Sequence, residues 1–126
     1  AQQIQCFSKI PLKSYSLIIV DSVTDLFSFE YSKKEQSLEK HISFMKYMQN
    51  LSSIAIDDKI PIIITNMVRT INKHEKENLE ESISMYTHTK IKLSKNSDGY
   101  LCQVISPFVK KKFQYTITSS GLTSGS

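Results

Sequence analysis

An acidic residue follows a strongly apolar segment near the start of the sequence. Residues Leu17 to Val20 are continuously apolar and partly β-branched, which predicts a central parallel strand buried on both faces, and Asp21 ends it. Open α/β sheets bind ligands at the carboxyl ends of their strands, where a carboxylate can hold a hydrated Mg²⁺ ion. Asp21 is therefore the first candidate metal ligand. The alternative is that Asp21 only caps the turn or helix that follows.

A second apolar run ends in two polar residues. Ile60 to Ile64 reads as a strand, because Pro61 is acceptable at a strand's start, and Thr65 and Asn66 follow it. In a parallel sheet these side chains would lie beside Asp21 and face the same crevice. The alternative is that Thr65 and Asn66 simply begin a loop.

Basic residues follow both predicted strands. Cations on loops at one edge of a sheet suit contacts to DNA phosphates, and the candidates are Lys33, Lys34, Arg69 and Lys73, with His74 and Lys76 nearby. Four glutamates interrupt the second group and would weaken its field, so a solvated loop is the alternative; they are Glu75, Glu77, Glu80 and Glu81. The run 110–112, three lysines, is read as a solvated turn in preference to a third phosphate contact.

These residues need a scaffold of strands and one long helix. Apolar residues recur at helical spacing between residues 38 and 55, which predicts an amphipathic helix packed on the sheet; they are Leu38, Ile42, Met45, Met48, Leu51, Ile54 and Ala55. Residues 69–81 lack a usable apolar period and are predicted to form a mobile loop with some helix.

The last third of the sequence is predicted to be β-structure. Three strands are expected at 89–93, 100–105 and 113–118, the first two joined by a turn over 96–99, which makes a β-meander. The expected organisation is one folded part over residues 1–118 and a flexible Gly/Ser/Thr-rich tail over 119–126.

Composition narrows the class of protein. The chain has 126 residues, a net charge of +4 and 40% hydrophobic residues, which fits a globular domain that is neither secreted nor membrane-bound. Cys6 and Cys102 are far apart and are expected to be buried thiols. The three glycines all lie at or after Gly99, so no GxxxxGK[ST] phosphate-binding loop is present, and the chain alone is not expected to hydrolyse ATP.

Four segments together resemble the RecA/RadA recombinase family. They are LIIVDSVTDLF, EYSKKEQSLEKH, IPIIITNMV and ISPFVKKKFQYTITSSGL, and the resemblance covers nearly all of Tyr15 to Leu122. It is to the C-terminal half of the ATPase core, from the Walker B strand onward, and implies an α/β fold: a RecA-like P-loop NTPase core with a parallel sheet, a flanking helix and a C-terminal β-meander. The phosphate-binding half would lie upstream of Ala1 or have been lost.

The resemblance also implies roles for individual residues. Asp21 would be the Walker B acid, with Ser22 as its neighbour in a site for ATP and Mg²⁺ that is complete only with residues outside this chain. Asn66 is assigned to the same site by its predicted position at the end of the second strand. Residues 30–37 would match the first DNA-binding loop, with Lys33 and Lys34 as contacts. Residues 69–84 would match the second, with Arg69 and Lys73 as contacts. No catalytic residue is assigned.

Two departures from the family pattern point to a divergent paralog. Met67 stands where related proteins carry Gln, and a thioether cannot report a γ-phosphate by hydrogen bonding; Ile105 replaces the acid before Ser106-Pro107. The leading hypothesis is a recombinase paralog in homologous recombination and DNA repair, hetero-oligomeric, with single-stranded DNA and a recombinase filament or another paralog as partners. The expected location is the nucleus in a eukaryote, or the cytoplasm and nucleoid in an archaeon. The alternatives are a non-catalytic interaction scaffold with a vestigial nucleotide site, and an unrelated P-loop motor or helicase.

Overall fold

The chain forms two compact units, Ala1–Tyr86 and Thr87–Ser126. A computed structural model describes residues 11, 14–25, 27, 37–105 and 110–124. Lys33, Lys34 and Cys6 lie outside these residues, as does most of the expected first DNA-binding loop. No helix within the described part is long and apolar enough to cross a membrane.

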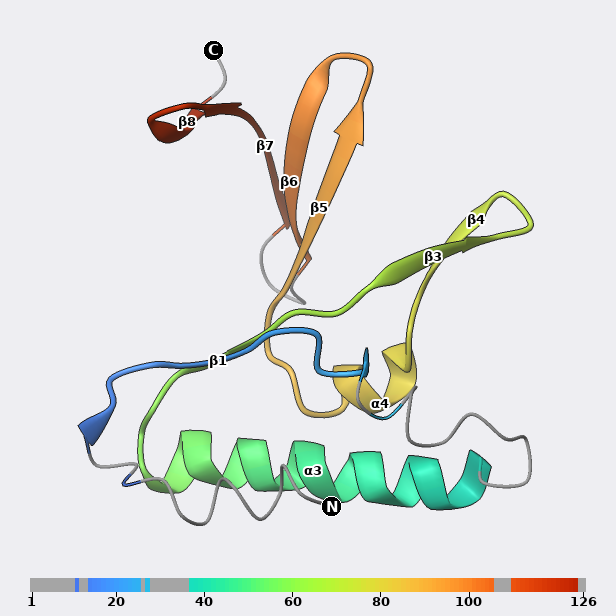
Figure 1. Ribbon diagram of the computed structural model, residues 1–126, viewed down its shortest axis with the longest axis vertical. Helices are drawn as coiled ribbons and strands as arrows, with labels where there is room; N and C mark the ends of the chain where they lie inside the picture. The colour runs from blue at the N-terminus through green and yellow to red at the C-terminus, as the bar shows by residue number, and fades with distance from the viewer. Residues whose placement is uncertain (1–10, 12–13, 26, 28–36, 106–109, 125–126) are drawn as a thin grey trace. The chain divides into compact units, whose positions relative to one another are not determined.

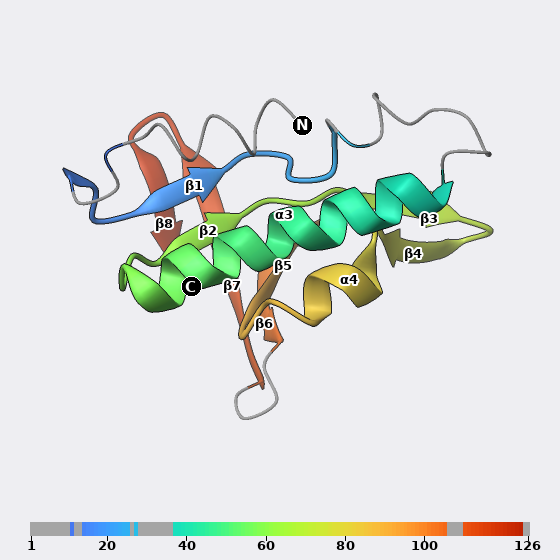
Figure 2. The ribbon, with the colours of Figure 1, turned by 90° about the horizontal axis from the view of Figure 1, so that it is seen from below.

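Two short parallel strands form the sheet of the first unit. Strand β1 (Ile18–Val20) pairs with β2 (Ile62–Ile64), with Ile19 opposite Ile63. Helix α3 (Ser37–Asp57) connects them in sequence and lies along one face of the pair (Figures 1 and 2). The predicted strand–helix–strand order is confirmed. The parallel arrangement is confirmed only here, because the other sheets are antiparallel.

The core of the first unit lies against one face of α3. Phe44, Tyr47, Met48 and Leu51, at the helical spacing of three and four residues, are buried together with Val23 and Phe27. The predicted helix is confirmed, but the predicted apolar stripe is only half right, since Leu38 and Ile42 are 70% and 47% exposed. Leu38 lies nine residues before Tyr47, two and a half helical turns, and therefore points to the opposite side.

A β-hairpin takes the place of the loop that was predicted over residues 69–81, and the helix expected in that segment is a short one at its end. Strand β3 (Val68–Ile71) pairs antiparallel with β4 (His74–Glu77), and α4 (Glu80–Ser84) follows. Asn72 and Lys73 form the turn, with φ of 51° and 66° at the two residues. Positive φ at both central residues is the signature of the tight hairpin turn whose twist matches that of the strands. The loop prediction was wrong because these strands are largely polar and show no apolar alternation.

The second unit is one antiparallel sheet in the order β5-β6-β7-β8. Its strands are β5 (Lys90–Asn96), β6 (Gly99–Ile105), β7 (Lys110–Thr118) and β8 (Gly121–Ser124). The predicted meander and its first turn are confirmed, and Gly99 has a φ of 126° at the end of that turn. Cys102 is buried in β6, as expected.

Two details of the second unit differ from expectation. Residues Lys110 to Lys112 begin β7 and do not form a turn, because they pair with Ile105 to Gln103 of β6. Residues 121–124, expected to be a flexible tail, form β8 and pair with β7. The tight turn over Ser119 and Ser120 returns the chain along β7, and Gly121 supplies the φ of 119° that this turn needs.

Candidate functional site at the strand ends

The carboxyl ends of β1 and β2 bring Asp21 and Thr65 together. The Thr65 hydroxyl donates a hydrogen bond to Asp21 Oδ1 (2.7 Å), and the Ser22 amide donates to Thr65 Oγ1 (2.7 Å). Backbone bonds continue the pairing past the strands, from Thr65 N–H to the Val20 carbonyl and from Val23 N–H to the Thr65 carbonyl, each 3.0 Å. The predicted neighbourhood of Asp21 and Thr65 is therefore confirmed.

The Asp21 carboxylate is exposed and oriented. Asp21 is exposed to solvent, and its Oδ1 atom accepts a hydrogen bond from the Thr65 hydroxyl. A carboxylate held in this way at a strand end, with the Thr65 hydroxyl beside it, offers oxygen atoms of the type that Mg²⁺ prefers as ligands. Ser22, which stands next to it, has a φ of 55°, so the chain turns sharply at this point.

Asn66 belongs to the same cluster through different partners. Its Oδ1 accepts hydrogen bonds from the Thr24 hydroxyl (2.8 Å) and from the Met67 amide (3.0 Å). Its Nδ2 donates to the Asn78 carbonyl (2.7 Å) and to Glu77 Oε1 (3.2 Å). The strand-end cluster therefore consists of Asp21, Ser22, Thr24, Thr65 and Asn66, and it continues into the end of hairpin β3–β4.

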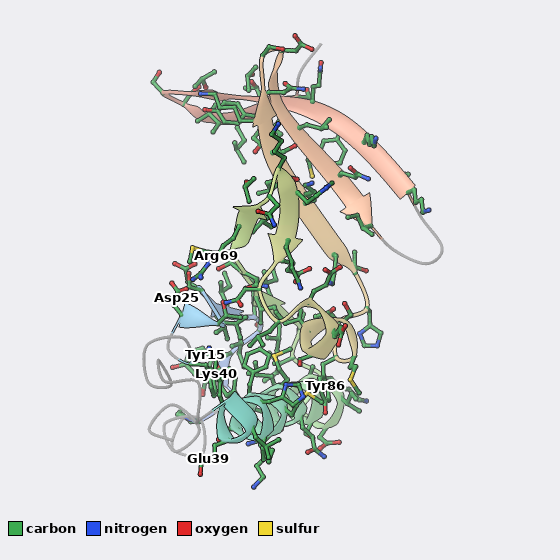
Figure 3. All side chains as sticks on the ribbon, turned by 90° about the vertical axis from the view of Figure 1, so that its right-hand side faces the viewer. Tyr15, Asp25, Glu39, Lys40, Arg69 and Tyr86 are labelled. Carbon is green, nitrogen blue, oxygen red and sulfur yellow. The ribbon has the colours of Figure 1, made fainter. Side chains whose placement is uncertain are left out.

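The hairpin sorts its charges onto two faces. Successive side chains of a strand point to opposite faces, and directly paired residues share one. Arg69 is paired with Lys76, so these cations share a face with His74, whereas Glu75 and Glu77 lie on the other. Arg69 is labelled in Figure 3. Two of the four glutamates that interrupt the basic group in the sequence, Glu75 and Glu77, thus lie on the opposite face from it, whereas Glu80 and Glu81 belong to α4.

Other predicted site residues are placed as follows. Lys73 is the second residue of the hairpin turn and is exposed. The structure adds Thr24, Glu77 and Asn78, which were not predicted to belong to a site, and it pairs Lys76, a member of the predicted basic group, with Arg69. Alternation of base and acid in His74-Glu75-Lys76-Glu77 was the available signal for Lys76. Thr24 had none, because its partner Asn66 is 42 residues away.

In α/β proteins, nucleotides bind at the carboxyl ends of parallel strands, where acidic and other polar residues follow the strands. The Rad51 family model matches residues 3–122, so the chain belongs to the Rad51 family, among the RecA/RadA-type recombinases, and its fold is RecA-like. It is also 44% identical over 64 residues to a protein of Thermoplasma volcanium named "DNA repair and recombination protein RadB". That match covers 49% of this chain and 26% of the relative, so only about a quarter of the relative is represented.

Proposed function

We propose that this chain is part of a recombinase paralog that acts in homologous recombination and DNA repair and assists a recombinase filament. Membership of the Rad51 family and the name of the RadB relative support the general role. The observation that carries the proposal is the continuity of the strand-end cluster with a charge-sorted hairpin. A partner filament or second paralog, and a nuclear or nucleoid location, belong to the same proposal.

The proposed nucleotide site has Asp21 and Ser22 as ligand contacts, with Asn66 beside them as a supporting residue whose amide is already hydrogen-bonded within the protein. The exposed Asp21 carboxylate, held by Thr65, fits an acid that binds a hydrated Mg²⁺ ion. The ion would supply positive charge to the phosphates of ATP. Residues outside this chain would have to hold those phosphates, because the only glycines here are at positions 99, 121 and 125.

The proposed DNA contact is the cationic face of hairpin β3–β4. Arg69 and Lys76 stand directly opposite each other, and like charges in that position destabilise a hairpin. A phosphate between the two side chains would remove this cost and gain two charge-assisted contacts. Lys73, at the turn, and Lys33 and Lys34, outside the described residues, complete the proposed set of DNA contacts.

A charge-reversal variant of the hairpin tests DNA binding without destabilising the fold. Arg69→Glu places a carboxylate opposite Lys76, so the hairpin should become as stable as before or more stable. DNA affinity should fall, and the slope of log affinity against log salt should flatten by about one unit. Fluorescence anisotropy with labelled single-stranded DNA at several salt concentrations measures both quantities.

The matched control is Lys46→Glu. It makes the same change of two charge units at an exposed position of α3, and so corrects for the change in net charge. Equal losses of affinity in the two variants would remove the hairpin from the DNA interface. An unchanged affinity in Arg69→Glu would do the same.

A second candidate function is a protein-interaction scaffold with a vestigial nucleotide site. One face of the second unit's sheet exposes several large apolar side chains, which favours an interface; they are Ile91, Leu93, Phe113, Ile117 and Leu122. Asp21→Ala separates the two functions. Loss of repair activity with partner binding intact supports the nucleotide role, whereas full activity supports the scaffold.

A further inference from the structure

The side chain of Asn66 uses its whole hydrogen-bonding capacity. An amide offers two donor hydrogens and two acceptor lone pairs. Here the oxygen accepts from Thr24 and Met67, and the nitrogen donates to Glu77 and Asn78, all within 2.7 to 3.2 Å. A side chain so occupied has no remaining donor or acceptor to give to a ligand while these bonds persist.

The partners of Asn66 come from three separate segments. Thr24 lies in the turn after β1, Met67 directly precedes β3, and Glu77 and Asn78 lie at the end of β4. A backbone bond from Asn78 N–H to the Met67 carbonyl (3.2 Å) closes the base of the hairpin beside it. Asn66 thus ties both ends of hairpin β3–β4 to the end of strand β1.

The Thr24 side of this network is fully buried. Thr24 is 0% exposed, and its hydroxyl donates to Asn66 Oδ1. Hydrogen bonds are strengthened in such surroundings, and a buried polar group left without its partner is strongly destabilising. Small reorientations of the Asn66 amide are therefore opposed from inside the unit.

We propose that Asn66 is a positioning residue that fixes hairpin β3–β4 against the end of β1 and so sets where the cationic face of the hairpin lies. Met67 cannot perform this task through its side chain, because a thioether has no hydrogen to donate. The consequence for DNA rests on the proposed function, but the positioning role of Asn66 does not.

Asn66→Asp is the primary test in the full chain. It keeps the size of the side chain but replaces the donor group with a carboxylate oxygen that faces the Asn78 carbonyl and the Glu77 carboxylate. At neutral pH, amide hydrogen exchange across residues 68–77 should accelerate about tenfold, because the half-buried Asn78 carbonyl and Glu77 carboxylate lose their donor and face a carboxylate instead. Amides in the middle of α3 should not change. The matched control is Asn50→Asp, an exposed position on α3.

Two further measurements distinguish positioning from a general loss of stability. Acidification should restore the protection factors of the hairpin amides in Asn66→Asp, each taken relative to the intrinsic exchange rate at the same pH. The reason is that the protonated carboxyl can again donate to the Asn78 carbonyl. Adding Glu77→Gln should restore it in part at neutral pH, because the new amide can donate to the new carboxylate. Thr24→Val, which preserves the shape of a buried residue, should accelerate hairpin exchange even if Asn66→Asp fails to fold.

The proposal is overturned if hairpin exchange is unchanged in both Asn66→Asp and Thr24→Val. It is also overturned if α3 and the hairpin accelerate equally, or if neither acid nor Glu77→Gln restores protection. DNA affinity of the same variants is read separately. If Arg69→Glu leaves DNA binding intact, the proposed DNA contact fails, while the exchange data still decide the role of Asn66.

Discussion

The phenol of Tyr47 lies inside the core of the first unit, against the ring of Phe27 at a centroid distance of 5.6 Å. Burial raises the pKa of this hydroxyl above its ordinary value of 10.0, because desolvation disfavours the phenolate. The folded chain therefore keeps a proton that the unfolded chain releases. This contribution to stability is complete below pH 10 and falls as the pH rises above it.

Tyr47→Phe should reduce that alkaline loss. With no hydroxyl to ionise, the free energy of unfolding of the variant should fall less between neutral pH and about pH 11 than that of the parent. Urea unfolding at a series of pH values, followed by circular dichroism, measures the difference. Curves that stay parallel over this range would contradict the assignment.

At the scale of single residues, the sequence correctly predicted which side chains meet at the ends of the parallel strands. Asp21 and Thr65 were expected to be neighbours because parallel strands end at the same edge, and a hydrogen bond of 2.7 Å joins them. Thr24 and Asn78 were missed. Their contacts to Asn66 depend on how a turn and a hairpin are directed in space, and no local pattern encodes that.

At the scale of elements, α3 shows that an apolar residue on a helix is not necessarily a core residue. Phe44 is 0% exposed and meets Phe27 edge-to-face with ring centroids 5.1 Å apart, whereas Leu38 on the same helix is largely exposed. The sequence has apolar residues on both sides of this helix, so periodicity alone could not identify the buried side. The bulky aromatic residues mark it.

Phe44→Ala and Leu38→Ala form a matched pair on this helix. Phe44→Ala should cost about 3 to 5 kcal/mol of unfolding free energy, since it removes a fully buried ring and leaves a cavity. Leu38→Ala should change it by no more than about 0.5 kcal/mol. Chemical denaturation followed by circular dichroism measures both. Similar losses in the two variants would mean that the stripe starting at Leu38 is buried after all.

The turn of hairpin β3–β4 holds a non-glycine residue in a strained backbone conformation, and a glycine there would relieve the strain. Asn tolerates the left-handed conformation, but Lys73, at a φ of 66°, does not adopt it readily. Lys73→Gly should remove about 1 kcal/mol of strain and slow amide exchange in both strands. Lys73→Ala loses the same charge but keeps the Cβ atom, so it should give no such protection. If glycine and alanine act alike, strain at this turn is excluded.

At the scale of the whole chain, the sequence predicted the type and order of the main elements better than their extent. The family resemblance and the meander were confirmed, whereas the hairpin and β8 were read as a loop and a tail. Both errors fall on polar strands, where the hydrophobic period that reveals a strand is missing. Their pairing comes from turns that reverse the chain within two residues.

The charge sorting of hairpin β3–β4 is a property of register and not of composition. Alternation along β3 and β4 places acids and bases on opposite faces although the segment contains both. An alanine inserted within β4, for example, would leave the net charge of the hairpin unaltered. It would nevertheless move every following side chain of the strand to the other face. Substitutions in this segment can therefore change its overall charge without moving side chains between faces. A change in its length instead moves the charges, so that a different face repels a polyanion.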